Sequence, residues 1–271
     1  MAPAAVRTPA GARRIESGGP WPFVTHVRYR LADGSLLDWS SRAHRKRRGH
    51  ARTWWEPARL GWWVAALFAV GSACFAVGSL PGYSSAVGVR ADAITYFVGS
   101  IFFTSASYLQ FVQCINTDPE ASGSRHWRRR LVAWQPRRVD WWATVVQLVG
   151  TVFFNFTTFD ALATGLNAHQ ENLVVWTPDA LGSVCFLVAS ELAYAEAGHR
   201  WVSWRPHDLG WRIAAVNMLG SIFFGISAIA GYVVPATGDL VNAALDTSGT
   251  FWGAVCFLIG SLLLFPEASQ S

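Results

Sequence analysis

The sequence predicts an all-α membrane protein with six transmembrane helices, and three observations support this. Of the 271 residues, 52% are apolar and 14% are charged, whereas about 25% charged residues is usual for a soluble globular chain. Six segments approach the roughly 20 apolar residues that a membrane-spanning helix needs. Basic residues gather before the first of these segments and in every second connection between them. The composition excludes a disordered chain, a coiled coil and a disulfide-stapled secreted module.

The predicted spans follow one another with short polar connections. They are Leu60–Leu80, Ala93–Ile115, Trp141–Ala161, Ala180–Ala195, Trp211–Val234 and Ser248–Phe265. The fourth span is the shortest and carries Glu191 inside it. Residues 1–59 contain no apolar segment of the kind that a signal peptide needs, so we expect none there.

The distribution of basic residues predicts the orientation. Of the 22 Lys and Arg residues, twelve precede Trp62, six lie between Asn116 and Val139, and three surround the loop after the fourth span. Arg90, in the first hairpin loop, is the remaining one. Because cytoplasmic loops carry an excess of Lys and Arg, we expect both termini to lie in the cytoplasm of a bacterial cell, with the helices in its inner membrane.

An internal repeat marks the start of each odd-numbered span. The pattern Trp-x-Pro-x4-Trp-x8-Gly-Ser/Thr-x2-Phe occurs three times with identical spacing, ending at Phe75, Phe154 and Phe224. The returning spans share a weaker pattern of Gly, Cys and Phe. Repeats that each cross the membrane twice all point the same way. The sequence therefore predicts three parallel two-helix hairpins, over 54–115, 127–197 and 204–267, in a pseudo-threefold bundle.

The third hairpin carries a likeness to a known family. The segment Trp252-Gly-Ala-Val-Cys-Phe-Leu-Ile-Gly-Ser-Leu-Leu-Leu-Phe-Pro266, with Leu219-Gly-Ser-Ile-Phe-Phe224 upstream, resembles the YrhK-like domain family of bacterial membrane proteins. The resemblance is best over residues 204–267 and fainter over the other two hairpins. It implies a bacterial integral membrane protein and carries over no activity, cofactor or catalytic residue. This chain departs from a single hairpin by having three.

The residues before the first span form a separate head. Residues 1–20 are rich in Ala, Pro, Gly and Arg and are expected to be disordered. Two alternating runs around Asp33-Gly34 predict a β-hairpin within residues 21–53, which we expect to dock on the bundle or on a partner, because a lone hairpin is marginal in water.

A polybasic stretch follows the predicted hairpin. The candidate contacts to anionic lipid headgroups are Arg45, Lys46, Arg47 and Arg48. Two other interpretations stay open. The stretch could act as a topology determinant alone, or it could bind nucleic acid, which the long apolar segments disfavour and which we do not expect.

Polar residues inside the spans mark the predicted interior. In the third span, Gln147, Thr151, Asn155 and Thr158 recur at i, i+4, i+8 and i+11, on one helix face. The repeat maps Asn217 and Ser221 onto the same stripe in the fifth span. The stripe could line a solute or ion path, or it could join helices by hydrogen bonds worth about 0.6 kcal/mol each. Glu191 is the candidate proton or cation site, or else an interfacial carboxylate paired with arginine.

Several chemistries are not indicated. None of the seven His lies deep in a span, there is no His-Glu-x-x-His motif or phosphate-binding loop, and the four Cys fit small packing positions. We therefore expect no cofactor and no metal site. The primary expectation is a non-enzymatic membrane protein that acts as a scaffold or in stress. The alternative is a transporter or channel for a small solute or ion along the bundle axis, and an intramembrane enzyme is a third, weaker interpretation.

Overall fold

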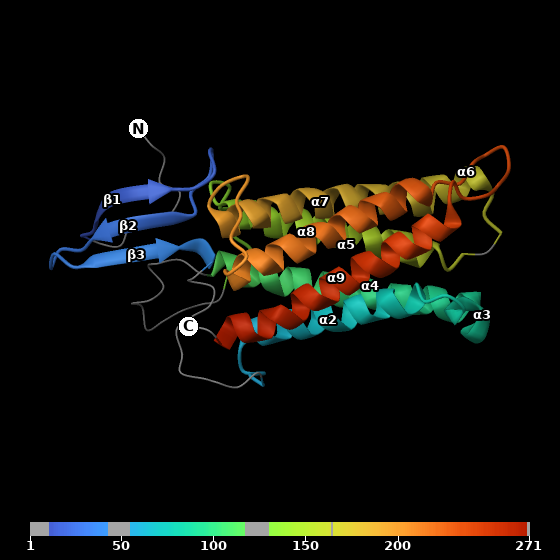
Figure 1. Ribbon diagram of the computed structural model, residues 1–271, viewed down its shortest axis with the longest axis horizontal. Coiled ribbons are helices and arrows are strands. Elements are labelled where there is room, and N and C mark those ends of the chain that lie inside the picture. The colour runs from blue at the N-terminus through green and yellow to red at the C-terminus, as the bar shows by residue number, and fades with distance from the viewer. Residues whose placement is uncertain (1–10, 43–54, 117–129, 164, 270–271) are drawn as a thin grey trace.

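The computed structural model describes residues 11–42, 55–116, 130–163 and 165–269. Figure 1 shows a small sheet at one end of an elongated bundle of helices. Within the described residues, six helices are long and apolar enough to cross a membrane. The fold is therefore that of a mostly helical, multi-pass membrane protein. We call the end of the bundle beside the sheet the head end and the opposite end the distal end.

The six membrane-spanning helices run along the length of the bundle (Figure 1). The helices are α2 (Leu60–Gly78), α4 (Val89–Ile115), α5 (Val139–Asp160), α7 (Thr177–Gly198), α8 (Leu209–Ala230) and α9 (Ala243–Ser269). A short helix, α3 (Tyr83–Val87), lies in the first distal loop.

The fourth span is longer than the sequence predicts. Helix α6 (Ala168–Glu171) and a π-helical turn (Asn172–Trp176) lead without a break into α7, which makes one span of 31 residues. Asn167 caps the start of α6, where its side chain accepts a hydrogen bond from Gln170 N. The prediction of a short span was wrong because it started after Pro178, a residue that the first turn of a helix tolerates.

The spans pack in a closed ring that follows the chain order. Within each hairpin, α2 packs on α4, α5 on α7, and α8 on α9. Between hairpins, α4 packs on α5, α7 on α8, and α9 returns to α2. Each spanning helix therefore has two neighbours along its length, and the first and last helices close the ring.

A pair of glycines joins the two helices of every hairpin. The pairs are Gly71 with Gly99, Gly150 with Gly182, and Gly220 with Gly253. A Cβ added to the first glycine of each pair would lie 3.0–3.2 Å from the carbonyl oxygen of the second. Lipid tails are as apolar as the helices, so helices associate in a membrane through such close backbone contact between small residues.

Six phenylalanine rings meet at the centre of the bundle, two from each hairpin. We call them the phenylalanine layer: Phe75, Phe103, Phe154, Phe186, Phe224 and Phe257. Their contacting centroids are 5.0–6.5 Å apart, mostly in edge-to-face or tilted arrangements. The void left among these rings is only about 10 Å³, at most enough for one water molecule. The layer therefore blocks the axis of the bundle.

The head is a three-stranded antiparallel sheet in the order β1 (Arg13–Gly18), β2 (His26–Arg30) and β3 (Leu36–Ser40). The predicted hairpin is present, since His26 pairs with Ser40 and Arg30 with Leu36 across the Asp33-Gly34 turn. Its buried side is formed by Val27, Tyr29 and Trp39.

The predicted disorder is wrong for residues 13–18, which form β1. This strand is polar and has no apolar alternation to reveal it. It is held by the backbone pairing with β2 and by an ion pair between Glu16 and Arg28 at 3.3 Å. This ion pair is exposed and contributes little, so β1 depends mainly on its main-chain hydrogen bonds.

The glycine pairs give a stability prediction. Substituting Gly253→Ala places a Cβ 2.6 Å from the Phe224 ring and 3.1 Å from the carbonyl oxygen of Gly220. We expect it to destabilise the bundle by about 1–3 kcal/mol, because overpacking forces the helices apart. The measurement is the thermal unfolding midpoint of the purified protein in detergent micelles.

The matched control is Gly225→Ala in the neighbouring helix α8. There the new Cβ meets only the flexible end of Leu187, at 3.2 Å, and alanine gains up to about 1 kcal/mol of helix propensity. Its midpoint should stay level or rise. Equal losses for the two variants would contradict the glycine-pair account.

Candidate functional site

A polar cavity lies inside the bundle between the phenylalanine layer and the head end. Its volume is about 150 Å³, and all six spanning helices contribute to its wall. Phe103, Phe186 and Phe257 of the phenylalanine layer line it on the distal side, together with Phe68. The cavity therefore lies within the membrane-spanning part of the protein and has an aromatic floor.

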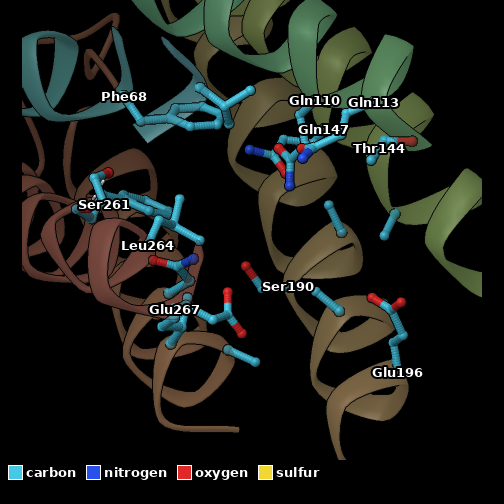
Figure 2. A pocket seen from close by; sticks show the side chains of 18 of the residues that line it. Phe68, Gln110, Gln113, Thr144, Gln147, Ser190, Glu196, Ser261, Leu264 and Glu267 are labelled. Carbon is cyan, nitrogen blue, oxygen red and sulfur yellow. Dashed lines mark hydrogen bonds between the residues drawn. The ribbon is translucent and has the colours of Figure 1, made fainter. Parts of the chain in front are cut away.

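Four carboxamide side chains line the cavity: Gln110, Gln113, Gln147 and Asn217. Figure 2 shows the first three close together on one part of the wall. The carbonyl oxygens Gln110 Oε1 and Asn217 Oδ1 are buried and have no hydrogen-bond partner among the residues that the structure describes. An unsatisfied buried polar group costs about 1–3 kcal/mol.

Two carboxylates lie on the cavity wall towards the head end. Glu196 of α7 is 2% exposed and Glu267 of α9 is 7% exposed, and both are labelled in Figure 2. Each is bound by the residues that follow β3. Ser41 Oγ donates to Glu196 Oε1 at 2.6 Å, and Arg42 Nε donates to Glu267 Oε1 at 2.9 Å. The head segment thus reaches into the mouth of the cavity.

A glycine makes room for the Arg42–Glu267 pair. A Cβ on Gly210, in the first turn of α8, would lie 2.5 Å from Arg42 Nε and 3.0 Å from Glu267 Oε1. The Arg42 side chain itself is only 18% exposed. Any larger residue at position 210 would therefore compete with the docked guanidinium for the same space.

Other contacts hold the sheet against the loop after α7. Thr25 Oγ1 lies 2.8 Å from His199 Nδ1, and the rings of His26 and His199 meet edge to face with centroids 5.5 Å apart. Trp201 Nε1 donates to the carbonyl oxygen of Trp21 at 3.2 Å. The head is therefore attached to the helical bundle both at the cavity mouth and beside it.

A buried ion pair fixes the start of α5 beneath the sheet. Arg138 and Asp140 are 1% and 0% exposed and form two hydrogen bonds, of 3.0 and 2.5 Å. The Arg138 guanidinium also lies 5.6 Å from the Trp39 ring, a distance suited to a cation–π contact. Removing either partner of such a pair would leave a buried charge, so we interpret it as structural.

The predicted polar stripe is divided by the phenylalanine layer. Gln147 and Asn217 line the cavity. Thr151 is fully buried and its hydroxyl donates to the carbonyl oxygen of Leu148 in its own helix. Asn155 Nδ2 donates to Thr104 Oγ1 at 2.8 Å, which joins α5 to α4. Only the head-side part of the stripe therefore faces the cavity.

The remaining two predicted site residues, Ser221 and Glu191, lie in different surroundings. Ser221 Oγ lies 2.7 Å from Ser190 Oγ and joins α8 to α7, and Ser190 lines the cavity. Glu191 is half-buried and is not among the cavity-lining residues. The candidate lipid contacts Arg45, Lys46, Arg47 and Arg48 lie outside the described residues.

Sequence reasoning missed the acidic and glutamine residues of the site. Glu196 and Glu267 fall just past the predicted ends of the fourth and sixth spans, where a carboxylate is normally solvated. Gln110 and Gln113, at i and i+3 near the end of α4, were an available signal, because this spacing places two amides on one face. The burial of the two glutamates comes from the docked head, which local patterns do not reveal.

The distal end is closed by hydrogen bonds between the second and third hairpins. Asn172 Nδ2 donates to the carbonyl oxygen of Val233 at 2.7 Å, and its Oδ1 accepts from Val233 N at 3.0 Å. Trp176 Nε1 donates to the carbonyl oxygen of Ala228 at 2.7 Å. Within the described part of the chain, no group of three or more His, Cys, Asp or Glu residues is arranged to hold a metal ion.

Comparisons with protein-family models, with curated protein sequences and with solved structures give no match. The chemistry of the site therefore rests on its own residues.

The histidine contact gives a pH prediction. Burial lowers the pKa of His199 below the ordinary histidine value of about 6.5, and the neighbouring His26 and Arg205 lower that pKa further, against Glu196 and Asp208, which raise it. The docked head thus favours neutral His199. The stability that neutral His199 gives to the docked head is fully present above about pH 6.5 and declines as the pH falls towards the lowered pKa of His199.

The measurement is the distance between spin labels at Ser35→Cys and Val202→Cys, both exposed, in a chain whose four native cysteines are replaced. We expect one narrow distance distribution at pH 7.5 and a broader one at pH 5. The control adds His199→Asn, which tolerates the left-handed backbone there (φ 57°) and does not titrate. A distribution as pH-sensitive in the control as in the parent would contradict the role of His199.

Proposed function

We propose that this protein binds a small polar solute in the cavity from the head side and transports it across the membrane. The observation that carries the proposal is the cavity inside the spanning bundle, whose wall carries the carboxamides of Gln110, Gln113, Gln147 and Asn217 and the carboxylates of Glu196 and Glu267. A scaffold needs only a packed interior, and a polar cavity in its core would reduce its stability without benefit. The geometry thus favours the transporter over the scaffold.

The phenylalanine layer favours a transporter over a channel. A channel needs a continuous path, whereas the void among Phe75, Phe154 and Phe224 is only about 10 Å³. Passage of a solute would require these rings to separate and the distal hydrogen bonds of Asn172 to break. Such alternating exposure of one central site is typical of transporters built from repeated helical units.

We also propose that the three hairpins are copies of one two-helix unit around a common axis. The closed ring of helices, the glycine pair in each hairpin and the two phenylalanine rings that each hairpin adds to the layer support this arrangement. We likewise propose membership of the YrhK-like family, which the pattern of residues 204–267 suggests.

The head end is proposed to face the cytoplasm of a bacterial cell, with the helices in its inner membrane. The support is the charge distribution, because 21 of the 22 Lys and Arg residues belong to the head or to the connections at the head end. The solute would then enter the cavity from the cytoplasm. The polybasic residues after Arg42 would lie beside the inner leaflet, where anionic headgroups could contact them.

Cysteine labelling tests whether the cavity is wet. In a chain without its four native cysteines, Gln147→Cys should react with a small, membrane-impermeant methanethiosulfonate added from the head side, because Gln147 lines the cavity. Thr151→Cys, one turn deeper and fully buried, is the matched control and should not react. Parallel labelling of right-side-out and inverted vesicles assigns the side.

The outcomes separate the candidate functions. No reaction at either position would mean a dry bundle and would overturn the solute-binding proposal in favour of a scaffold. Reaction at both positions, from both sides, would indicate a continuous channel. Reaction of Gln147→Cys in right-side-out vesicles alone would place the head outside the cytoplasm and contradict the proposed orientation.

A further inference from the structure

We propose that the cavity takes a small organic cation with a guanidinium or primary ammonium group, and that Arg42 is a tethered competitor for its place. The inference rests on the solute-binding function proposed above and assigns the chemical class of the solute. Three features of the cavity carry it: the position of Arg42, the carboxamide side chains deeper in the wall, and the aromatic floor.

The Arg42 side chain shows that the cavity mouth accommodates a guanidinium. It lines the cavity, it is largely buried, and its Nε donates to Glu267 at 2.9 Å. The absence of a side chain at Gly210 provides the slot in which this group lies. A built slot beside a buried carboxylate is suited to a planar cation, which forms directed, charge-assisted hydrogen bonds.

The groups deeper in the cavity also suit a ligand rich in hydrogen-bond donors. The cavity is lined by four carboxamides, Gln110, Gln113, Gln147 and Asn217, each of which has an acceptor oxygen, and an ammonium or guanidinium carries donors and no acceptor. The floor presents the rings of Phe68, Phe103 and Phe257, and aromatic faces attract cations. A neutral solute of the same shape would lack the charge attraction of the carboxylate and the cation–π attraction of the rings.

The cavity sets the size of the cation. Its volume is about 150 Å³, and a single water needs roughly 10–15 Å³ on this measure. The space is therefore of the order of ten water molecules, which suits a solute of about ten non-hydrogen atoms or fewer.

Docking of the head and binding of the cation are then mutually exclusive at Glu267. A free cation must displace Arg42. The apparent affinity for the cation is therefore the intrinsic affinity multiplied by the fraction of molecules in which Arg42 has left the mouth. By reciprocity, the bound cation favours release of the segment that carries Ser41 and Arg42. The head is thereby a built-in regulator of the site.

The test is isothermal titration of the full-length protein in lipid nanodiscs with methylguanidinium at low millimolar concentration. Methylurea, a neutral molecule with the same number of non-hydrogen atoms, is the matched ligand control. The variants are Arg42→Ala, Glu267→Gln and, as a control for loss of a head arginine away from the cavity, Arg30→Ala, whose side chain is exposed. Arg42→Gln, which keeps a polar side chain but removes the charge, is a second route to remove the competitor if Arg42→Ala fails to fold.

We expect methylguanidinium to bind, and methylurea to bind at least about tenfold more weakly. If the mouth is free in about a tenth of the molecules, Arg42→Ala and Arg42→Gln should tighten methylguanidinium binding about tenfold, Glu267→Gln should abolish it, and Arg30→Ala should leave it unchanged.

Each of the other possible results would contradict one part of the proposal. Equal binding of methylurea and methylguanidinium would reject the cationic class while leaving the solute-binding function in place. Equal affinities of the parent, Arg42→Ala and Arg42→Gln would reject the tethered competitor. Absence of binding of both ligands to every variant would reject the cation, and a dry cavity in the cysteine labelling would separately reject solute binding itself.

Discussion

Six phenylalanine rings, two from each hairpin, pack against one another at the centre of the bundle and fix the height of every helix along its axis. Helices in a bilayer gain little from burying apolar surface against each other, because the lipid is equally apolar. The specificity of helix packing must therefore come from the complementary shapes of the side chains. A glycine on one helix lies against a phenylalanine of its hairpin partner, as Gly253 does against Phe224, so that the rings can occupy the axis while the backbones stay close.

This layer divides the interior into two unlike halves. On the distal side, Asn155 Nδ2 and Ser227 Oγ donate hydrogen bonds between helices, while Asn155 Oδ1 has no donor among the described residues. On the head side, the helices leave a cavity lined by carboxamides and carboxylates, and the head segment occupies its mouth through Ser41 and Arg42. The proposed alternating access depends on these parts: the aromatic barrier, the cavity on one side of it and the head segment at the cavity mouth.

The sequence was sufficient for the parts of the fold that rest on local physics. Hydropathy located six spans, the Asp33-Gly34 turn located the β2–β3 hairpin, and a periodic stripe led to Gln147 and Asn217. It failed where long-range contacts decide. Strand β1 has no apolar alternation, and its pairing with β2 became visible only in three dimensions.

The candidate site shows the same limit. Glu191 stood out because it lies within an apolar run, yet its helix face directs it away from the cavity lining. Glu196, five residues later, falls just past the predicted end of the fourth span and was not singled out, and it is buried where Ser41, 155 residues away in the chain, binds it. Periodicity gives the face of a helix but not the identity of what covers its end, so a docked segment cannot be predicted from the helix alone.

A high-resolution electron cryomicroscopy structure of the full-length protein in lipid nanodiscs tests the central claim most directly. The account predicts a closed phenylalanine layer, with ordered non-protein density in the cavity beside Gln110 and Asn217. Side chains collapsed into that space, with both amides bonded to neighbouring helices and no density between them, would contradict it.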